Sequence, residues 1–342
     1  MYMKKKLVNA FVCMVMAILL TTLQGYAKIL TVSNNTAISA QYTTLSAAFT
    51  AANSGDTVYI HGSNTAYGDI TLNKRLVVIG PGYTPTNPTA LPATIGTFTL
   101  DTLNGVSGTS GTYITGLVMG TLNVSSGYNS HVMNNITLRR NRINSYAYIG
   151  SSNTETHNWL IQENLINYLS QNTNNTLSTN ILIINNIFNY SYNIYKSIFT
   201  NNVIYNVPTF SECTVSNCIF IAAAGNNSSV NNTFNSNLFT SAITFTSGTN
   251  TFLPTGQATT NSDPQFAGGT GTSYLSISNY QLQVASAGHN AGTDGKDLGI
   301  YGGTGFLWGG SPAVPMIYYY NLKPNYIQAN GTLNITISVK NQ

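Results

Sequence analysis

The sequence predicts an all-β solenoid, in which the chain winds as a stack of short coils. Three observations predict it. The 342-residue chain contains 45 asparagines, 30 glycines and 22 tyrosines, while only 6% of its residues are charged. An asparagine-centred motif recurs every 15 to 23 residues, and short apolar segments flank its copies. Disordered chains usually lack so many aromatic and β-branched residues, so the composition indicates a folded, β-rich protein.

Residues 1–27 have the pattern of a secretory signal peptide. Lysines at residues 4–6 precede an apolar run over residues 7–23, and the small residues Gly25 and Ala27 precede the expected cleavage point. A run this short suits an export signal better than a membrane span of about 20 residues. We therefore expect a secreted or cell-surface protein whose mature chain has no transmembrane segment.

The mature chain is nearly neutral. Removing the signal peptide takes away three lysines and leaves 10 Lys and Arg residues against 9 Asp and Glu residues, a net charge of +1. Such a chain lacks the positive surface that nucleic acid requires. Only Cys213 and Cys218 remain, and they either close a small disulfide loop or stay reduced. We expect no nucleic-acid partner, no cofactor and a monomer.

Six asparagines define the repeat. They are Asn141, Asn164, Asn186, Asn202, Asn217 and Asn237, at spacings of 23, 22, 16, 15 and 20 residues. Two positions after each comes an apolar residue: Ile143, Ile166, Phe188, Ile204, Ile219 and Phe239. Helical repeats need about 33 or more residues per unit, so these units are too short to be helical.

A repeat of this length fits one coil of a β-solenoid. Coils stack at the interstrand distance of about 4.8 Å, so equivalent residues form columns, and about 12 coils would give a rod of roughly 55–60 Å. The apolar column fills the interior. We expect the repeated asparagine to adopt the left-handed backbone conformation at a bend, to bond to the same amide one coil away, or both.

A short helix is predicted ahead of the first coils. Leu45, Ala48, Phe49 and Ala52 share one face, followed by a Gly-Asp pair and the strands at residues 57–60 and 76–79. Such a helix would cover the open end of the core.

Four short stretches follow the last coil, at residues 263–266, 280–282, 286–292 and 297–303, and we call them the closing segment. Taken with the repeat and the helix, residues 29–303 resemble the right-handed parallel β-helix proteins of the pectin-lyase-like type, and the closing segment is similar to that of exported bacterial β-helix proteins. Their Ser-Pro-Ala-x-Asn-x-Gly pattern is matched here at Asn290 and Gly292 but not at Ala287 and Gly288. The resemblance implies a single-stranded right-handed parallel β-helix.

The expected organisation is a signal peptide at 1–27, a β-helix at 28–310 and a short C-terminal β segment or cap at 311–342. In that last segment, Leu333, Ile335, Ile337 and Val339 alternate with polar residues, which predicts a half-buried strand that pairs with residues 316–322.

A charged cluster is the first candidate site: Arg139, Arg140, Arg142, Glu155, His157 and Glu163. In one interpretation, Arg140 and Glu163 form a surface ion pair on consecutive coils, worth about 0–1 kcal/mol. In the other, suggested by the resemblance, the cluster is a lyase site in which an arginine abstracts a proton beside a uronate carboxylate. Only three acids lie between residues 118 and 261, too few for the calcium site that such lyases use or the paired carboxylates of a glycosidase.

A tyrosine stripe is the second candidate site. It comprises Tyr146, Tyr148, Tyr168, Tyr190, Tyr192 and Tyr205, interspersed with Asn144, Asn167, Asn189 and Asn206. Tyrosine offers a flat apolar face and a hydroxyl, and asparagine offers amide donors and an acceptor, so the stripe matches the chemistry of sugars. Alternatively, the tyrosines only stabilise neighbouring coils.

Two further columns flank the repeated asparagine. The residue before it is always polar (Arg140, Glu163, Asn185, Asn201, Ser216 and Ser236), and we expect it to face solvent or a polar bend. The residue after it is mostly apolar (Arg142, Leu165, Ile187, Val203, Cys218 and Leu238), which indicates either a partner surface or burial at a corner.

The function that these patterns favour is a non-catalytic, exported β-helix protein that displays an extended surface for a glycan or a cell-surface partner. The alternative is a polysaccharide-active enzyme, either pectate-lyase-like or a glycoside hydrolase. A purely structural spacer also fits the sequence, because this fold supports many functions.

Overall fold

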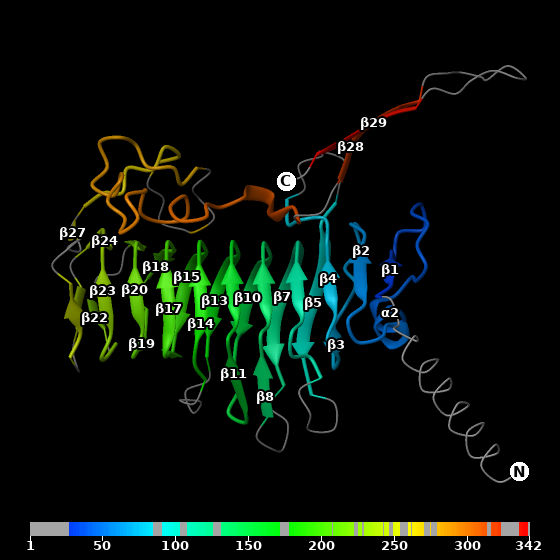
Figure 1. Ribbon diagram of the computed structural model, residues 1–342, viewed down its shortest axis with the longest axis horizontal. Helices are drawn as coiled ribbons and strands as arrows, with labels where there is room; N and C mark the ends of the chain where they lie inside the picture. Colours follow the sequence, from blue (N-terminus) through cyan, green and yellow to red (C-terminus); the bar gives the residue numbers. More distant parts are fainter. Residues whose placement is uncertain are drawn as a thin grey trace, which may run out of the picture.

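The chain forms a parallel β-helix (Figure 1). The computed structural model describes residues 27–84, 91–102, 108–125, 131–171, 178–206, 208–221, 225–227, 229–241, 243–245, 249–253, 259–260, 262–269, 274, 279–312, 316–322 and 335–340. Two long parallel sheets run along the rod, so the all-β solenoid predicted from the sequence is confirmed.

The first sheet has 11 strands and the second has 10. The first contains, in order, β1 (Ile29–Val32), β2 (Thr57–Ile60), β4 (Val77–Ile79), β6 (Tyr113–Thr115), β9 (Thr137–Arg139), β12 (Leu160–Gln162), β14 (Ile181–Ile184), β17 (Ser197–Thr200), β20 (Thr214–Ser216), β23 (Thr233–Asn235) and β26 (Thr251–Phe252). The second contains β3 (Ile70–Leu72), β5 (Ala93–Leu100), β7 (Leu117–Val124), β10 (Arg142–Tyr148), β13 (Leu165–Ser170), β15 (Ile187–Tyr192), β18 (Val203–Tyr205), β21 (Ile219–Ile221), β24 (Leu238–Phe239) and β27 (Thr259–Thr260).

Three two-stranded pairs make up a shorter third side of the rod. They join β8 (His131–Asn134) with β11 (Thr154–His157), β16 (Ile194–Tyr195) with β19 (Phe210–Ser211), and β22 (Gly225–Asn227) with β25 (Ile243–Phe245). Eleven stacked strands at about 4.8 Å correspond to a rod of about 50 Å, close to the expected length.

The interior column is buried as predicted, with one correction of register. Ile143, Ile166, Phe188 and Ile204 are aligned in consecutive strands and are fully buried. In the next coil the residue in line is Phe220, and not Ile219 as the repeat predicts. In this coil Cys218 therefore occupies the position that Asn202 has in the coil before it. Asn217, which the repeat aligns with Asn202, lies one residue earlier.

The repeated asparagines form a buried amide ladder. Each Nδ2 donates to the Oδ1 of the next coil: Asn141 to Asn164 at 3.2 Å, Asn164 to Asn186 at 3.0 Å, and Asn186 to Asn202 at 3.1 Å. Cys218 continues the ladder, because its thiol donates to the Ser216 carbonyl two residues earlier, as Asn164 does to the Gln162 carbonyl.

The left-handed conformation belongs to the residue before each ladder position. Positive φ values of 51–57° occur at Arg140, Glu163, Asn185, Asn201, Asn217 and Ser236. The prediction of a left-handed bend was thus correct, but its position was one residue too late. Because the preceding residue adopts the left-handed conformation, the ladder asparagine does not have to, and its side-chain amide points inward.

The predicted capping helix is present as α2 (Leu45–Ala51), at the first end of the rod (Figure 1). The Thr44 hydroxyl accepts from the Ala47 N–H at 3.3 Å and caps the helix. The expected apolar face is buried, with the Phe49 ring packing edge-on against Phe98 at a centroid distance of 6.1 Å. The end of the core is therefore closed to water.

The closing segment, residues 262–312, returns along the outside of the rod toward the first coils (Figure 1). Its backbone covers the left-handed residues that precede each ladder position, which we call the polar bend column. Asn185 Nδ2 donates to the carbonyls of Ile300 and Gly302, and Gly299 N–H donates to the Asn217 carbonyl. The segment ends near η1 (Trp308–Gly310), where Gly310 (φ 64°) packs so tightly that a Cβ would overlap the Tyr83 ring.

Of the two surroundings predicted for the column before the repeated asparagine, solvent or a polar bend, the structure shows the bend. Arg140, Glu163, Asn185, Asn201 and Ser236 are buried at it, and in the coil with the shifted register the buried bend residue is Asn217 in place of Ser216. The closing segment also settles the position of the apolar column that follows the ladder. Leu165, Ile187, Val203, Ile219 and Leu238 point out of the coil and form a second core with Phe266, Tyr280, Leu298 and Ile300 of the closing segment.

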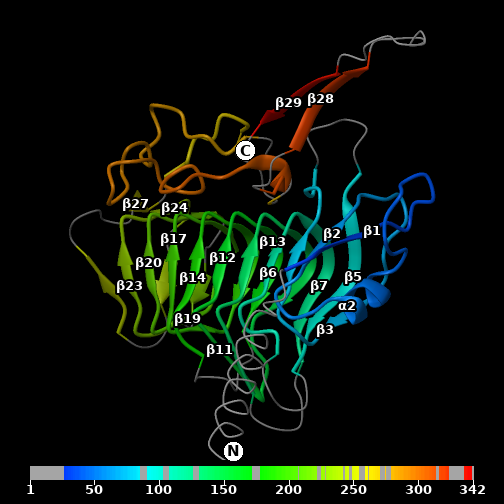
Figure 2. The ribbon, with the colours of Figure 1, turned by 45° about the vertical axis from the view of Figure 1, so that its right-hand side comes forward.

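The C-terminal residues form an antiparallel hairpin, as the alternating pattern predicts. β28 (Met316–Leu322) pairs with β29 (Ile335–Lys340), with Tyr320 opposite Ile337, and the hairpin extends away from the rod (Figure 2). In the described ranges, no helix is long and apolar enough to cross a membrane.

Candidate functional site

Five of the six predicted tyrosines lie together in one stacked array. Tyr146, Tyr168 and Tyr190 are aligned in β10, β13 and β15, with ring centroids 4.7 Å and 4.6 Å apart. Tyr148 and Tyr192 pack beside them, at 5.2 Å from Tyr146 and 5.7 Å from Tyr190. We call these five residues the tyrosine ladder.

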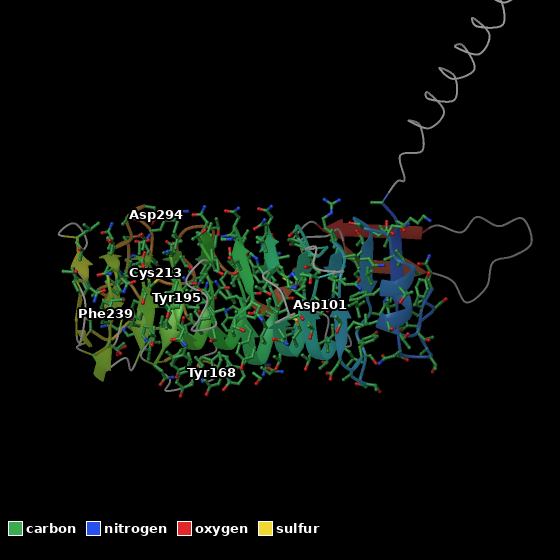
Figure 3. All side chains as sticks on the ribbon, turned by 90° about the horizontal axis from the view of Figure 1, so that it is seen from below. Asp101, Tyr168, Tyr195, Cys213, Phe239 and Asp294 are labelled. Atoms are coloured by element: carbon green, nitrogen blue, oxygen red, sulfur yellow. The ribbon has the colours of Figure 1, made fainter. Side chains whose placement is uncertain are left out.

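The ladder lies on the surface of the rod. Tyr146 is 38% exposed and the other four rings are partly exposed, and Figure 3 shows Tyr168 on the outer edge of the rod, away from the interior. Since the rings stack face to face along the rod, neighbouring rings cover much of their faces. The ladder therefore offers a row of phenol groups more than an open aromatic platform.

Three of the ladder hydroxyls have a pKa above the ordinary value for tyrosine. Burial among neighbouring rings raises the pKa of Tyr148, Tyr168 and Tyr192 above the usual value of 10.0, with the nearby tyrosines adding to the effect. Each of these phenols can thus both donate and accept a hydrogen bond.

A second amide row runs beside the ladder. The Nδ2 of Asn167 donates to the Asn144 carbonyl at 3.1 Å, that of Asn189 to Asn167 Oδ1 at 2.8 Å, and that of Asn206 to Asn189 Oδ1 at 3.0 Å. The predicted mixture of tyrosines and asparagines is therefore a continuous row of uncharged groups that spans several coils, with Arg142 at one edge, where it donates to Asn144.

Tyr205 does not belong to this surface. It is only 1% exposed, and its hydroxyl contacts that of Tyr280 in the closing segment at 2.9 Å. Burial raises its pKa to about 12. β18 ends at Tyr205 and is three residues shorter than β15, so this strand does not reach the level of Tyr190.

Ser170 is the position that sequence reasoning missed. It is aligned with Tyr148 in β10 and with Tyr192 in β15, so the outer tyrosine column is Tyr148–Ser170–Tyr192. The signal was present in the sequence: Tyr148 and Tyr192 each follow a ladder tyrosine by two residues, whereas Ser170 follows Tyr168 by the same interval.

The charged residues do not assemble into one site. Glu163 is held between Arg139 and Arg140: its Oε1 accepts from Arg139 Nη2 at 2.6 Å and its Oε2 from Arg140 Nε at 2.8 Å. Arg140 also donates from Nη1 to the Ser311 carbonyl at 3.0 Å. Since Glu163 is 3% and Arg140 8% exposed, the expected surface ion pair is instead a buried one that anchors the closing segment.

The other three charged candidates lie elsewhere. Arg142 donates to Asn144 at 2.8 Å beside the tyrosine ladder. Glu155 and His157 contact each other at 3.3 Å on β11, where His157 also contacts Thr179 at 2.9 Å. The structure thus brings together three of the six residues and separates the remainder on different sides of the coil.

The described residues include neither a cluster of metal ligands nor an activated thiol. Within this part of the chain, no three His, Cys, Asp or Glu side chains are grouped closely enough to hold a metal ion. Cys213 and Cys218 are both free and buried, and burial raises the pKa of each thiol to about 12. The small disulfide loop considered from the sequence is therefore not formed.

Comparisons with known proteins add no assignment for this site. No model of a known protein family matches the chain, and no curated protein is significantly similar to it.

Proposed function

We propose that this protein is exported and binds an extracellular polysaccharide through the tyrosine ladder, without catalysing a reaction. The observation that supports the proposal is the ladder itself, a partly exposed array of stacked phenols with an amide row beside it. We further propose that it belongs with the pectin-lyase-like β-helix proteins at the cell surface, on the basis of the signal-peptide pattern and the helix-capped coil stack.

The chemistry of the ladder fits a neutral glycan. Phenol and carboxamide groups donate to and accept from sugar hydroxyls, and exposed ring edges contact sugar C–H groups. Four coils carry these groups in register, so a polymer with repeating hydroxyls can contact several of them at once. Such multiple contacts raise affinity without a deep pocket.

The alternative, a polysaccharide lyase that uses the arginine cluster, has weaker support. A catalytic base must reach the substrate with a free nitrogen, whereas Glu163 holds both arginines and Ser311 accepts from one of them. We regard the cluster as a structural anchor.

Retention on immobilised polysaccharides tests the proposal. Purified chain from residue 28 onward is passed over a panel of neutral and acidic polysaccharides, with the ultraviolet absorbance of unsaturated lyase products recorded in the same fractions. We expect retention on a neutral member without new absorbance, and its loss in a Tyr168→Ala, Tyr190→Ala double variant. Tyr195→Ala, on the third side of the rod, is the control.

Two outcomes would contradict the proposal. Unchanged retention in the double variant together with a lower melting temperature would mean that the ladder only stabilises the coils. New absorbance that disappears in Arg140→Ala would support the lyase instead.

A further inference from the structure

The outer column of the tyrosine ladder is interrupted by one residue. Tyr148, Ser170 and Tyr192 are consecutive in register, so the backbones that carry the two tyrosines are two coil spacings, about 9.6 Å, apart. No ring contact joins Tyr148 to Tyr192 among the ring contacts of the described residues, although each ring contacts the inner column.

The interruption has the height of one coil. In the inner column, where every coil supplies a tyrosine, successive centroids are 4.7 Å and 4.6 Å apart. A flat group at the level of Ser170 would lie one coil spacing, about 4.8 Å, from the backbone level of each outer tyrosine, and the Tyr192 ring leans toward that level, with its centroid 6.2 Å from that of Tyr168. The ordinary distance for stacked rings in proteins is about 4.5–7 Å between centroids.

The surroundings of this position favour a neutral, hydroxylated ring. Its two walls are phenol rings, and its inner side is bounded by Tyr168, which lies 6.2 Å from Tyr192. Ser170 contributes a hydroxyl whose contact is a long one, at 3.3 Å to the Gln171 carbonyl. The four residues that bound the position are all uncharged, and Arg142 lies six positions before Tyr148 in β10, about 20 Å along the strand.

We propose that Ser170 marks a subsite for a single pyranose ring of a neutral polysaccharide, clamped between Tyr148 and Tyr192. This inference rests on the proposed function and gives it a position and a sugar class. A pyranose whose substituents are all equatorial, such as a β-1,4-linked glucose or xylose unit, presents C–H groups on both faces. An axial hydroxyl would instead point into one of the tyrosine rings, where no hydrogen-bond acceptor of matching strength is present.

Filling the interruption tests the subsite. Ser170→Tyr completes the outer column, so we expect an unchanged or higher melting temperature. We also expect binding of cellohexaose or xylohexaose to weaken about tenfold or more, because the sugar loses its contacts with both outer rings. Ser170→Ala keeps the space open and is expected to bind within a few-fold of the unmodified protein. Ser211→Tyr, which adds a ring beside Tyr195 in a paired strand of the third side, is the matched control and should bind normally.

A second variant covers the case in which Ser170→Tyr fails to fold. Tyr148→Ala removes one wall without adding bulk, and it should also weaken binding about tenfold. A galactan oligomer, which has an axial hydroxyl, should bind more weakly than cellohexaose in the unmodified protein.

The outcomes separate this inference from the proposed function. If the unmodified protein binds a polysaccharide and Ser170→Tyr binds it equally well, the subsite is refuted while the proposed function stands. If the unmodified protein retains none of the panel, both fail.

Discussion

Replacement of Asn164 by alanine tests the amide ladder at a position inside the stack. The Asn164 side chain is fully buried and takes part in five hydrogen bonds. Its Nδ2 donates to the Leu138 and Gln162 carbonyls, both at 2.9 Å, and to Asn186 Oδ1 at 3.0 Å. Its Oδ1 accepts from the backbone N–H of Asn141 at 2.9 Å and from Asn141 Nδ2 at 3.2 Å.

The expected loss of stability follows from these contacts. A net value of about 1 kcal/mol per bond gives about 5 kcal/mol, and one of the three donated contacts must be shared because an amide has two hydrogens. Alanine also leaves the Asn141 N–H buried without a partner. We therefore expect Asn164→Ala to lower the free energy of unfolding by about 3–5 kcal/mol, a large part of the roughly 5–15 kcal/mol typical of folded domains.

Urea denaturation measures this loss. Trp159 is a suitable reporter because it is buried in the same coil, where its Nε1 donates to the Met133 carbonyl at 2.9 Å. Amide hydrogen exchange at Asn141 and its neighbours shows whether the loss is local, since a stack of coils can open in part. Asn144→Ala is the control, because Asn144 is exposed and its side chain accepts one bond, from Arg142. A difference of less than about 1 kcal/mol between the two variants would refute the ladder's assigned role.

Three further predictions concern other parts of the rod. Cys218→Asn should raise the free energy of unfolding by about 1 kcal/mol, because it replaces the long contacts from Asn202 to the Cys218 sulfur, at 3.5 Å and 3.8 Å, by amide bonds. Urea midpoints of this variant and of Cys218→Ala, which should be less stable, check the effect. Glu163→Gln should cost about 3 kcal/mol, because it leaves the buried Arg140 without its counter-charge. Glu155→Gln, in a more exposed pair, should cost less than about 1 kcal/mol, and equal costs would contradict the buried anchor. Finally, the backbone N–H groups of Lys28 and Asn53, both 2.8 Å from the Asp56 carboxylate, hold the pKa of Asp56 below its usual 3.8. Because this pKa is lowered in the folded state, the stabilisation is present above about pH 4 and is lost as the pH falls further. Acid titration of unfolding should therefore show a smaller loss in Asp56→Asn, and an identical loss would refute the role of this carboxylate.

The coil stack could be predicted from the sequence because two columns, the repeated asparagine and the apolar residue two positions after it, recur over several coils. The prediction failed at Asn217, where the correct ladder residue is Cys218. Ile219, Phe220 and Ile221 are all apolar, so the local alternation does not fix which of them points inward, and a shift of one residue exchanges the two faces. The repeat then selects the asparagine as the ladder residue, although a thiol can make the same contact to the carbonyl two residues earlier.

The cover over the polar bend column had no local signal in the sequence. Asn185 and the carbonyls of Ile300 and Gly302 are more than 100 residues apart in the chain, and nothing near Asn185 shows that a backbone will return to it. The same is true of Arg140 and Ser311. Tyr205 was misplaced for a related reason, since its partner Tyr280 also lies in the closing segment.

The two outward surfaces of the second sheet solve different physical problems. The apolar column beside the polar bends would expose hydrophobic side chains to water, and the closing segment covers both. Stability alone accounts for the burial of these residues, because the segment supplies apolar contacts to the column and hydrogen bonds to the bends. The tyrosine ladder stabilises itself by stacking and needs no cover. Ser170 departs from this pattern. A tyrosine there would gain two stacking contacts of about 0.5–1.5 kcal/mol each, and at this position the chain forgoes them. If the proposed subsite is correct, the missing contacts leave room for a sugar ring at this position. Ser170, more than the tyrosines around it, is therefore the residue whose variants test whether this surface binds a ligand or only stabilises the coils.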